Sequence, residues 1–186
     1  MQISKDLAVT AFGQETTYYC GPASASQLLY YLGVRSNPVD GRPLTQANLA
    51  TDLYTSSSTG TPFPGWWETT LETWSKRGWT AVWAPNNPNF TLSFFWNTTL
   101  NDIDNNRPLI YDCVMSPTNG YLPGYEGTTA TIYHYVTGSG YWFEDTFTYF
   151  NVHYVDPNRY RSGAFGWHSV SRDLMYNVVR GRGMVY

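Results

Sequence analysis

The chain has 186 residues, a length typical of one domain, and 13% of them are charged, with a net charge of −3. No basic run occurs, which excludes the electrostatic pattern of a nucleic-acid-binding protein. No apolar run approaches the roughly 18 residues of a membrane span. Two cysteines are too few for a disulfide framework, and the neutral polar composition favours a secreted protein whose signal peptide lies outside this sequence.

The first half of the chain has the periodicity of helices. A helix that starts near Cys20 has one apolar face, formed by Ala25, Leu28, Leu29 and Leu32. Pro22 suits its first turn and Gly33 suits its end. Further helices are predicted over residues 45–54, 67–74 and 94–103. The aromatic clusters at residues 66–67 and 94–96 follow this helical spacing, which predicts core packing rather than sugar-binding platforms.

The second half is rich in β-branched and aromatic residues, which predicts strands over residues 108–114, 131–137 and 149–155. We expect the second of these strands to stop at Gly138-Ser139-Gly140, with residues 141–143 pairing back across the turn. A late short helix is predicted over residues 171–176, capped by Ser169 or Ser171.

Helices followed by strands predict a single α+β domain with an antiparallel sheet. The helical half is expected at about residues 14–105 and the sheet half at about residues 106–186. In this arrangement the helix that starts near Cys20 would pack on the sheet.

The segment around Cys20 carries the strongest indication of chemistry. Cys20 stands where the predicted helix begins, and a helix N-terminus presents free N–H groups and the positive end of the helix dipole. Both stabilise a thiolate, which is the nucleophilic form of cysteine. Gln14 lies six residues upstream, so its amide could face the backbone N–H of Cys20 and form an oxyanion hole with it. The alternative is that Gln14 is a plain loop residue.

This pattern resembles the papain-like C39 peptidases, the bacteriocin-processing type, and within them the stand-alone C39-like domains. The resemblance rests on Gln14, on Cys20-Gly21-Pro22-Ala23-Ser24 and, further along, on Arg107-Pro108, His134-Tyr135-Val136-Thr137-Gly138 and Asp156-Pro157. It implies a bacterial thiol hydrolase of papain-like fold, with a Cys20–His134–Asp156 triad and Gln14 in the oxyanion hole. Tyr133 stands where family members often have glycine, and residues 144–149 form an insertion that could reshape the cleft or its rim.

Three histidines compete as the general base. His134 is favoured because it opens a strand after a loop and precedes the Asp156-Pro157 pair. His153 lies three residues before Asp156 in one strand, so the two side chains would point to opposite faces. His168 is interpreted as a surface or packing residue. Asp156 has a structural alternative as the turn-forming residue before proline, and Asn151 is the substitute that would then orient the histidine.

The two cysteines have less reactive alternatives. Cys20 could be a small core residue, because cysteine is among the most buried residue types. Cys113 lies within a predicted strand between apolar neighbours and is expected to be buried and inert. A disulfide between Cys20 and Cys113 would remove the nucleophile.

The sequence therefore predicts a monomeric cysteine peptidase that hydrolyses peptide or isopeptide bonds in a peptide or protein substrate. No metal or other cofactor is expected, because no metal-ligand spacing or phosphate-binding loop occurs. Two alternatives stay open. One is an acyl or γ-glutamyl transferase or a glutamine deamidase on the same fold, and the other is a non-catalytic papain-like binding domain.

Overall fold

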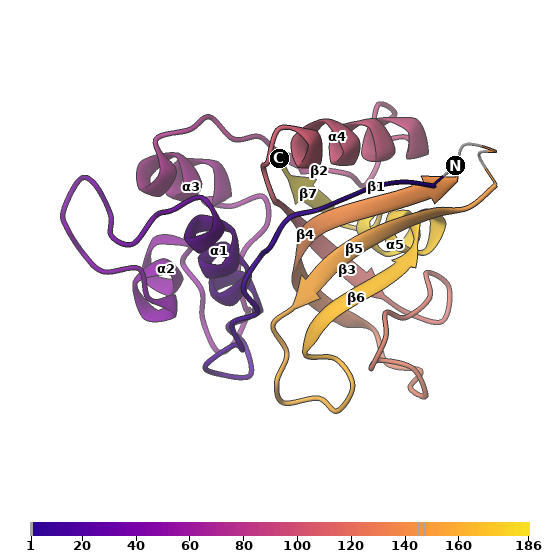
Figure 1. Cartoon of the computed structure of the whole chain (residues 1–186). Helices are drawn as coiled ribbons and strands as arrows, with labels where there is room; N and C mark the ends of the chain where they lie inside the picture. The colour runs from indigo at the N-terminus through magenta and orange to yellow at the C-terminus, as the bar shows by residue number, and fades with distance from the viewer. Residues whose placement is uncertain (1, 145, 147) are drawn as a thin grey trace.

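The computed structural model describes residues 2–144, 146 and 148–186, and within them the chain forms helices and one antiparallel sheet (Figure 1). The helices are α1 (Cys20–Tyr31), α2 (Gln46–Asp52), α3 (Trp67–Ser75), α4 (Leu92–Asp104) and α5 (Arg172–Val179). The strands are β1 (Gln2–Asp6), β2 (Ala81–Trp83), β3 (Leu109–Met115), β4 (Ile132–Glu144), β5 (Phe150–Asp156), β6 (Gly166–Ser171) and β7 (Gly183–Val185). The α+β class predicted from the sequence is confirmed.

Strand β4 is the centre of the sheet. The strand order is β2-β7-β3-β4-β5-β6, and β1 pairs with β4 outside this path. Along one edge of β4, residues 132–138 pair with β3 and residues 140–144 pair with β1. The long strand is therefore paired on this edge by two segments that are far apart in the sequence.

The predicted turn at Gly138-Ser139-Gly140 is wrong, because β4 runs through it with only a register shift against β5. The two glycines serve close packing instead. A Cβ atom on Gly138 would lie 2.6 Å from the ring of Tyr111, and one on Gly140 would overlap Asp6 of the neighbouring strand. Glycine in a strand interior marks such a close approach as readily as it marks a turn.

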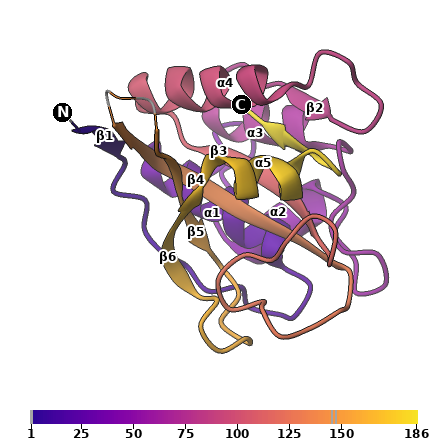
Figure 2. The ribbon, with the colours of Figure 1, turned by 90° about the vertical axis from the view of Figure 1, so that its right-hand side faces the viewer.

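Helices cover both faces of the sheet. Figure 1 shows α1, α2 and α3 grouped on one side, and Figure 2 shows α5 in front of the sheet with α1 and α2 behind it. Alternate side chains of β3 point to opposite faces of the sheet. Ile110 packs with the α1–α3 cluster, whereas Tyr111 and Cys113 pack with α4 and α5. Alternation of side chains along a strand produces this division.

The five predicted helices form close to their expected positions. Thr45, Thr91 and Ser171 cap α2, α4 and α5 through side-chain oxygens that accept backbone N–H groups. Helix α4 belongs to the predicted helical half but packs on the opposite face of the sheet from α1. The chain-order division into two halves is thus only approximate, since β1 and β2 also join the sheet from the first half.

The predicted aromatic core is confirmed except at one residue. Trp67 and Phe95 are fully buried, whereas Trp66 is 48% exposed and stacks on the exposed ring of Tyr54.

The insertion between β4 and β5 joins the end of β4 to the start of β5. His134 lies near the start of β4 and Asp156 at the end of β5, so the described residues of the insertion do not line the cleft beside them. Asp145 and Phe147 of that insertion lie outside the described residues. None of the helices described is both long and apolar enough to cross a membrane.

Candidate active site

Cys20 is the first residue of α1, as the sequence predicts. The first hydrogen bond of this turn runs from the N–H of Ala23 to the carbonyl of Tyr19, and Pro22 has no N–H to donate. Helix geometry therefore leaves the N–H groups of Cys20 and Gly21 without partners inside the helix. These donors and the helix dipole favour negative charge at the position that the cysteine sulfur occupies.

Gly21 allows a neighbouring loop to close against the start of α1. A Cβ atom at this position would overlap the side chain of Thr61. Thr61 is itself held by Thr55, whose hydroxyl lies 2.8 Å from its own, and its carbonyl accepts from the hydroxyl of Tyr135 at 2.9 Å. The glycine that follows Cys20 is thus explained by close packing, and the Thr61 loop forms one wall beside the cysteine.

His134 and Asp156 come together from β4 and from the end of β5. The Nε2 atom of His134 lies 2.8 Å from Oδ1 of Asp156, and the side chains are only 4% and 0% exposed. The expectation that Asp156 merely forms the turn before Pro157 does not account for this contact. Because Nε2 faces Asp156, Nδ1 is the nitrogen that the ring has left for another partner.

Asp156 and Cys20 both act on the charge state of this ring. Burial acts to lower the pKa of His134, but the charge of Asp156, its hydrogen bond and a hydrogen bond with the Cys20 side chain together raise it to about 10. The protonated ring is therefore the favoured form at neutral pH. An imidazolium held between a carboxylate and a sulfur stabilises a thiolate on that sulfur.

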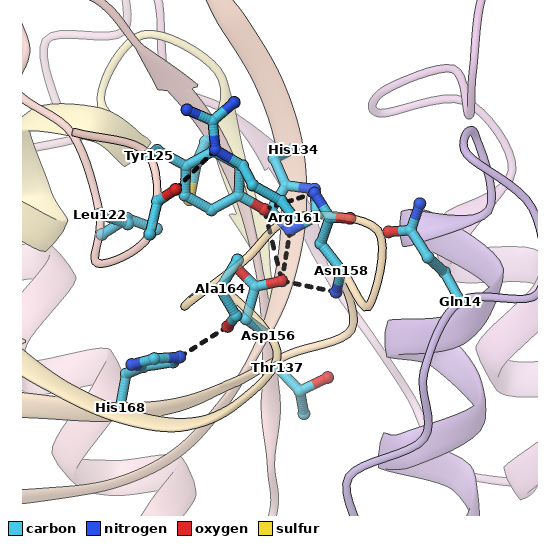
Figure 3. A network of polar contacts seen from close by, with 12 residues as sticks. Gln14, Leu122, Tyr125, His134, Thr137, Asp156, Asn158, Arg161, Ala164 and His168 are labelled. Carbon is cyan, nitrogen blue, oxygen red and sulfur yellow. Dashed lines mark hydrogen bonds and ion pairs between the residues drawn. The ribbon is translucent and has the colours of Figure 1, made fainter. Parts of the chain in front are cut away.

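Two further residues, neither of them predicted from the sequence, hold Asp156 in place. Asp156 Oδ1 also accepts the backbone N–H of Asn158 at 2.7 Å, and the Asn158 side chain donates to the hydroxyl of Tyr125 at 3.0 Å. The Tyr125 ring lies 5.3 Å from the His134 ring, and its hydroxyl is 3.5 Å from the same carboxylate oxygen. Figure 3 shows these side chains gathered around Asp156.

Gln14 lies in a loop that is fixed to the same corner of the molecule. Its backbone N–H donates to the carbonyl of Pro157 at 2.7 Å, directly after Asp156. The Gln14 side chain is 2% exposed, Nε2 donates to the Thr16 carbonyl at 2.8 Å, and Oε1 is buried without a partner in the described structure. Figure 3 shows its amide oxygen directed toward His134 and Asn158 and its amide nitrogen turned away from them. One N–H of the amide is therefore left for another acceptor.

The competing residues lie elsewhere. Cys113 is fully buried, its thiol pKa is raised by burial, and both cysteines are free, so the structure has no Cys20–Cys113 disulfide. His153 is paired with Asp6 and His168 with the Ala164 carbonyl. The side chain of Asn151 contacts Ser169 rather than His134. Among the described residues, no three His, Cys, Asp or Glu side chains gather in a way that could hold a metal ion.

A groove of about 660 Å³ lies beside Cys20. Its lining residues include Thr61, Tyr133 and Tyr135. Asp112 and Arg182 also line it, and they form an ion pair in which Nε of Arg182 lies 2.9 Å from Oδ2 of Asp112. Burial raises the pKa of Asp112 to about 7, although Arg182 acts to lower it. This pair was not predicted from the sequence, because the two residues are far apart in the chain and carry no motif.

A cysteine at a helix start, beside a buried histidine–aspartate pair in an α+β fold, is the arrangement typical of thiol hydrolases. The model of the Peptidase C39 like family matches residues 6–173. The chain belongs to this family, as its sequence motifs indicate. No curated protein matches the chain.

Proposed function

We propose that the protein is a cysteine peptidase of papain-like fold that hydrolyses peptide or isopeptide bonds through a thioester on Cys20. The observation that carries the proposal is the buried His134–Asp156 pair, whose histidine also interacts with the Cys20 side chain. Membership of a peptidase family supports the same class of reaction.

The first half of the reaction forms the thioester. The Cys20 thiolate attacks the carbonyl carbon of the scissile bond, and a bond forms between Sγ and that carbon while the carbonyl oxygen becomes an oxyanion. The N–H groups of Cys20 and the Gln14 side chain would donate to this oxygen. His134 gives its proton to the departing amine as the carbon–nitrogen bond breaks.

The second half releases the acid. Neutral His134 takes a proton from water, whose oxygen attacks the thioester carbon through a second oxyanion. Collapse of this intermediate breaks the bond to Sγ and restores the thiolate beside an imidazolium. Asp156 would keep Nε2 of the ring protonated through both halves, which leaves Nδ1 facing the reacting atoms.

Active-site labelling tests the proposal. Iodoacetamide or an epoxysuccinyl inhibitor should alkylate Cys20 at neutral pH and abolish hydrolysis of a mixture of unstructured peptides. Peptide mapping should find the label on Cys20 and not on the buried Cys113. The C113A variant should keep its reactivity, whereas C20A should lose hydrolysis by about 10³-fold or more. Undiminished hydrolysis by C20A would overturn the proposal.

Mass spectrometry of the products separates this function from the alternatives. A peptidase releases a free acid and a new amine from the peptide chain. A transferase incorporates an added amine, and a deamidase converts a glutamine side chain to glutamate without cleaving the chain. A non-catalytic binding domain predicts a Cys20 that fails to react with either reagent.

A further inference from the structure

The Asp112–Arg182 pair beside Cys20 has no part in the reaction proposed above. Its two members differ sharply in exposure: the Asp112 side chain is 1% exposed and the Arg182 side chain is 23% exposed. A ligand in the groove therefore meets the guanidinium and not the carboxylate behind it. Among the described residues that line the groove, Arg182 is the only cation.

The structure fixes the orientation of this guanidinium. Asp112 engages Nε from the buried side. The rings of Trp83 and Tyr133 lie 5.3 Å and 5.2 Å from the guanidinium carbon, and both rings are exposed at the surface. Arg182 also interacts with the Tyr135 side chain. Because arginine carries five N–H donors in a rigid planar fork, these two partners still leave N–H groups of the terminal nitrogens for an acceptor.

The chemistry of this fork defines the ligand. Two parallel N–H groups match the two oxygens of a carboxylate, and such charge-assisted pairs are stronger than hydrogen bonds between neutral groups. A cationic side chain would be repelled by the guanidinium. A neutral amide could accept only through its single carbonyl oxygen.

We propose, on the basis of the peptidase function proposed above, that Arg182 binds a carboxylate of the peptide substrate in the groove beside Cys20 and that Asp112 positions Arg182. The enzyme is then selective for acidic peptides. Asp112 acts through Arg182 and does not itself touch the substrate. The carboxylate comes from an acidic side chain or from the C-terminus of the substrate.

A matched set of peptides tests the selectivity. A peptide that the enzyme cleaves is scanned with Glu and with Gln at each position on both sides of the scissile bond, with an amidated C-terminus. The wild-type protein should prefer Glu at one position by about 10-fold in kcat/KM, the effect of about 1.4 kcal/mol. A second arm compares the free acid with the amide at the C-terminus and identifies which carboxylate is bound. Equal rates for every Glu and Gln pair and for both termini would overturn the proposal.

Arg182→Gln should reduce the ratio of kcat/KM between the Glu and Gln peptides to about 1. Arg182→Lys should keep only part of the preference, because lysine lacks the planar fork. In R182Q the buried carboxylate of Asp112 lacks its cationic partner, which could disturb the fold. The double variant D112N/R182Q removes both charges, so it tests the loss of the Glu preference without an unpaired buried charge. Arg180→Gln is the control, since Arg180 lies two residues away, is exposed and does not line the groove. A preference that survives in both R182Q and the double variant would contradict the assignment.

Alkylation separates failure of this inference from failure of the proposed function. Iodoacetate carries a carboxylate and iodoacetamide does not, so a cation near Cys20 raises the rate of alkylation by iodoacetate relative to the rate by iodoacetamide. The ratio of the iodoacetate rate to the iodoacetamide rate should fall several-fold in R182Q and in D112N/R182Q and stay unchanged in R180Q. A Cys20 that reacts with neither reagent contradicts the peptidase function. Reactivity with both reagents at a ratio that Arg182 does not change contradicts the carboxylate site alone.

Discussion

Nε2 of His134 lies 2.8 Å from Oδ1 of Asp156, and both side chains are shielded from solvent. Burial of a charged pair costs desolvation free energy that the attraction between the charges often fails to offset. The pair is therefore poorly explained as a device for stability. Its contacts with the Asn158 N–H and its interaction with Cys20 indicate a ring held in one orientation for use beside a sulfur.

Asp156→Asn should weaken the enzyme by removing the negative charge that favours the imidazolium. We expect kcat/KM at pH 7 to fall on the order of 10²-fold. A serine triad loses about 10⁴-fold in kcat on the same change, and the loss here should be smaller because the thiolate is intrinsically more nucleophilic. In the wild type, the rate of iodoacetamide alkylation at Cys20 should change at about pH 10, where His134 loses its proton. In the Asp156→Asn variant, this change should occur at a lower pH.

The matched control for this prediction is Asp173→Asn, because Asp173 is exposed and its ion pair with Arg172 is a surface contact. This variant should retain the wild-type pH profile. An Asp156→Asn protein with the same rate and the same profile as the wild type would show that Asp156 does not act on His134.

The free energy of unfolding should depend on pH through His134. Its pKa in the folded protein is raised to about 10 from an ordinary value of 6.5. The folded state therefore binds the proton more tightly, and the stabilisation is fully present below pH 6.5 and is lost as the pH rises toward 10. Urea unfolding at pH 6.5, 8 and 9.5 should show this decline in the wild type and a smaller one in His134→Gln. Parallel curves for the two proteins would contradict the raised pKa.

The parts of the fold that the sequence predicts are those with a local pattern. Helix α1 has an apolar face at helical spacing with a proline in its first turn, and β3 and β5 are continuous β-rich runs. Strands β1, β2, β6 and β7 were not predicted, because they are short or exposed and form by pairing with distant segments. Ile3, for example, lies opposite Phe143 of β4. Pairing over such distances leaves no periodicity within either segment.

The candidate site divides in the same way. Cys20 is recognisable from its own neighbours, namely the helix start and the Gly-Pro that follows it. His134 and Asp156 were predicted from their order along the chain and from resemblance, and the structure places them in contact. Tyr125 was not predicted, because its loop carries no motif and only the folded chain brings its ring against His134. The Asp112–Arg182 pair depends likewise on β7 lying beside β3.

Gln14→Ala should lower kcat by about 10²-fold with little change in KM, because an oxyanion donor acts on the transition state and not on the bound substrate. The loop should keep its place, since it is the backbone N–H of Gln14 that donates to the Pro157 carbonyl. Steady-state kinetics on one cleaved peptide measures the two parameters. Gln2→Ala, at an exposed position of β1, serves as the control and should leave both unchanged. A rise in KM at constant kcat would assign Gln14 to substrate binding instead.

Gly21→Ala should destabilise the protein and disturb the groove, although alanine is the better helix former by about 1 kcal/mol. The added methyl group would overlap the side chain of Thr61, and such overpacking typically costs about 1–3 kcal/mol. Thr61→Gly in the same protein should recover part of the loss, because it removes the atoms that the methyl group meets. A double-mutant cycle by urea unfolding should therefore give a coupling free energy of about 1 kcal/mol or more between positions 21 and 61.

Gly78→Ala is the matched control, since nothing lies within 4 Å of a Cβ atom there. If Gly21→Ala proved as stable as Gly78→Ala, with no coupling to position 61, close packing would not be the reason for glycine after Cys20.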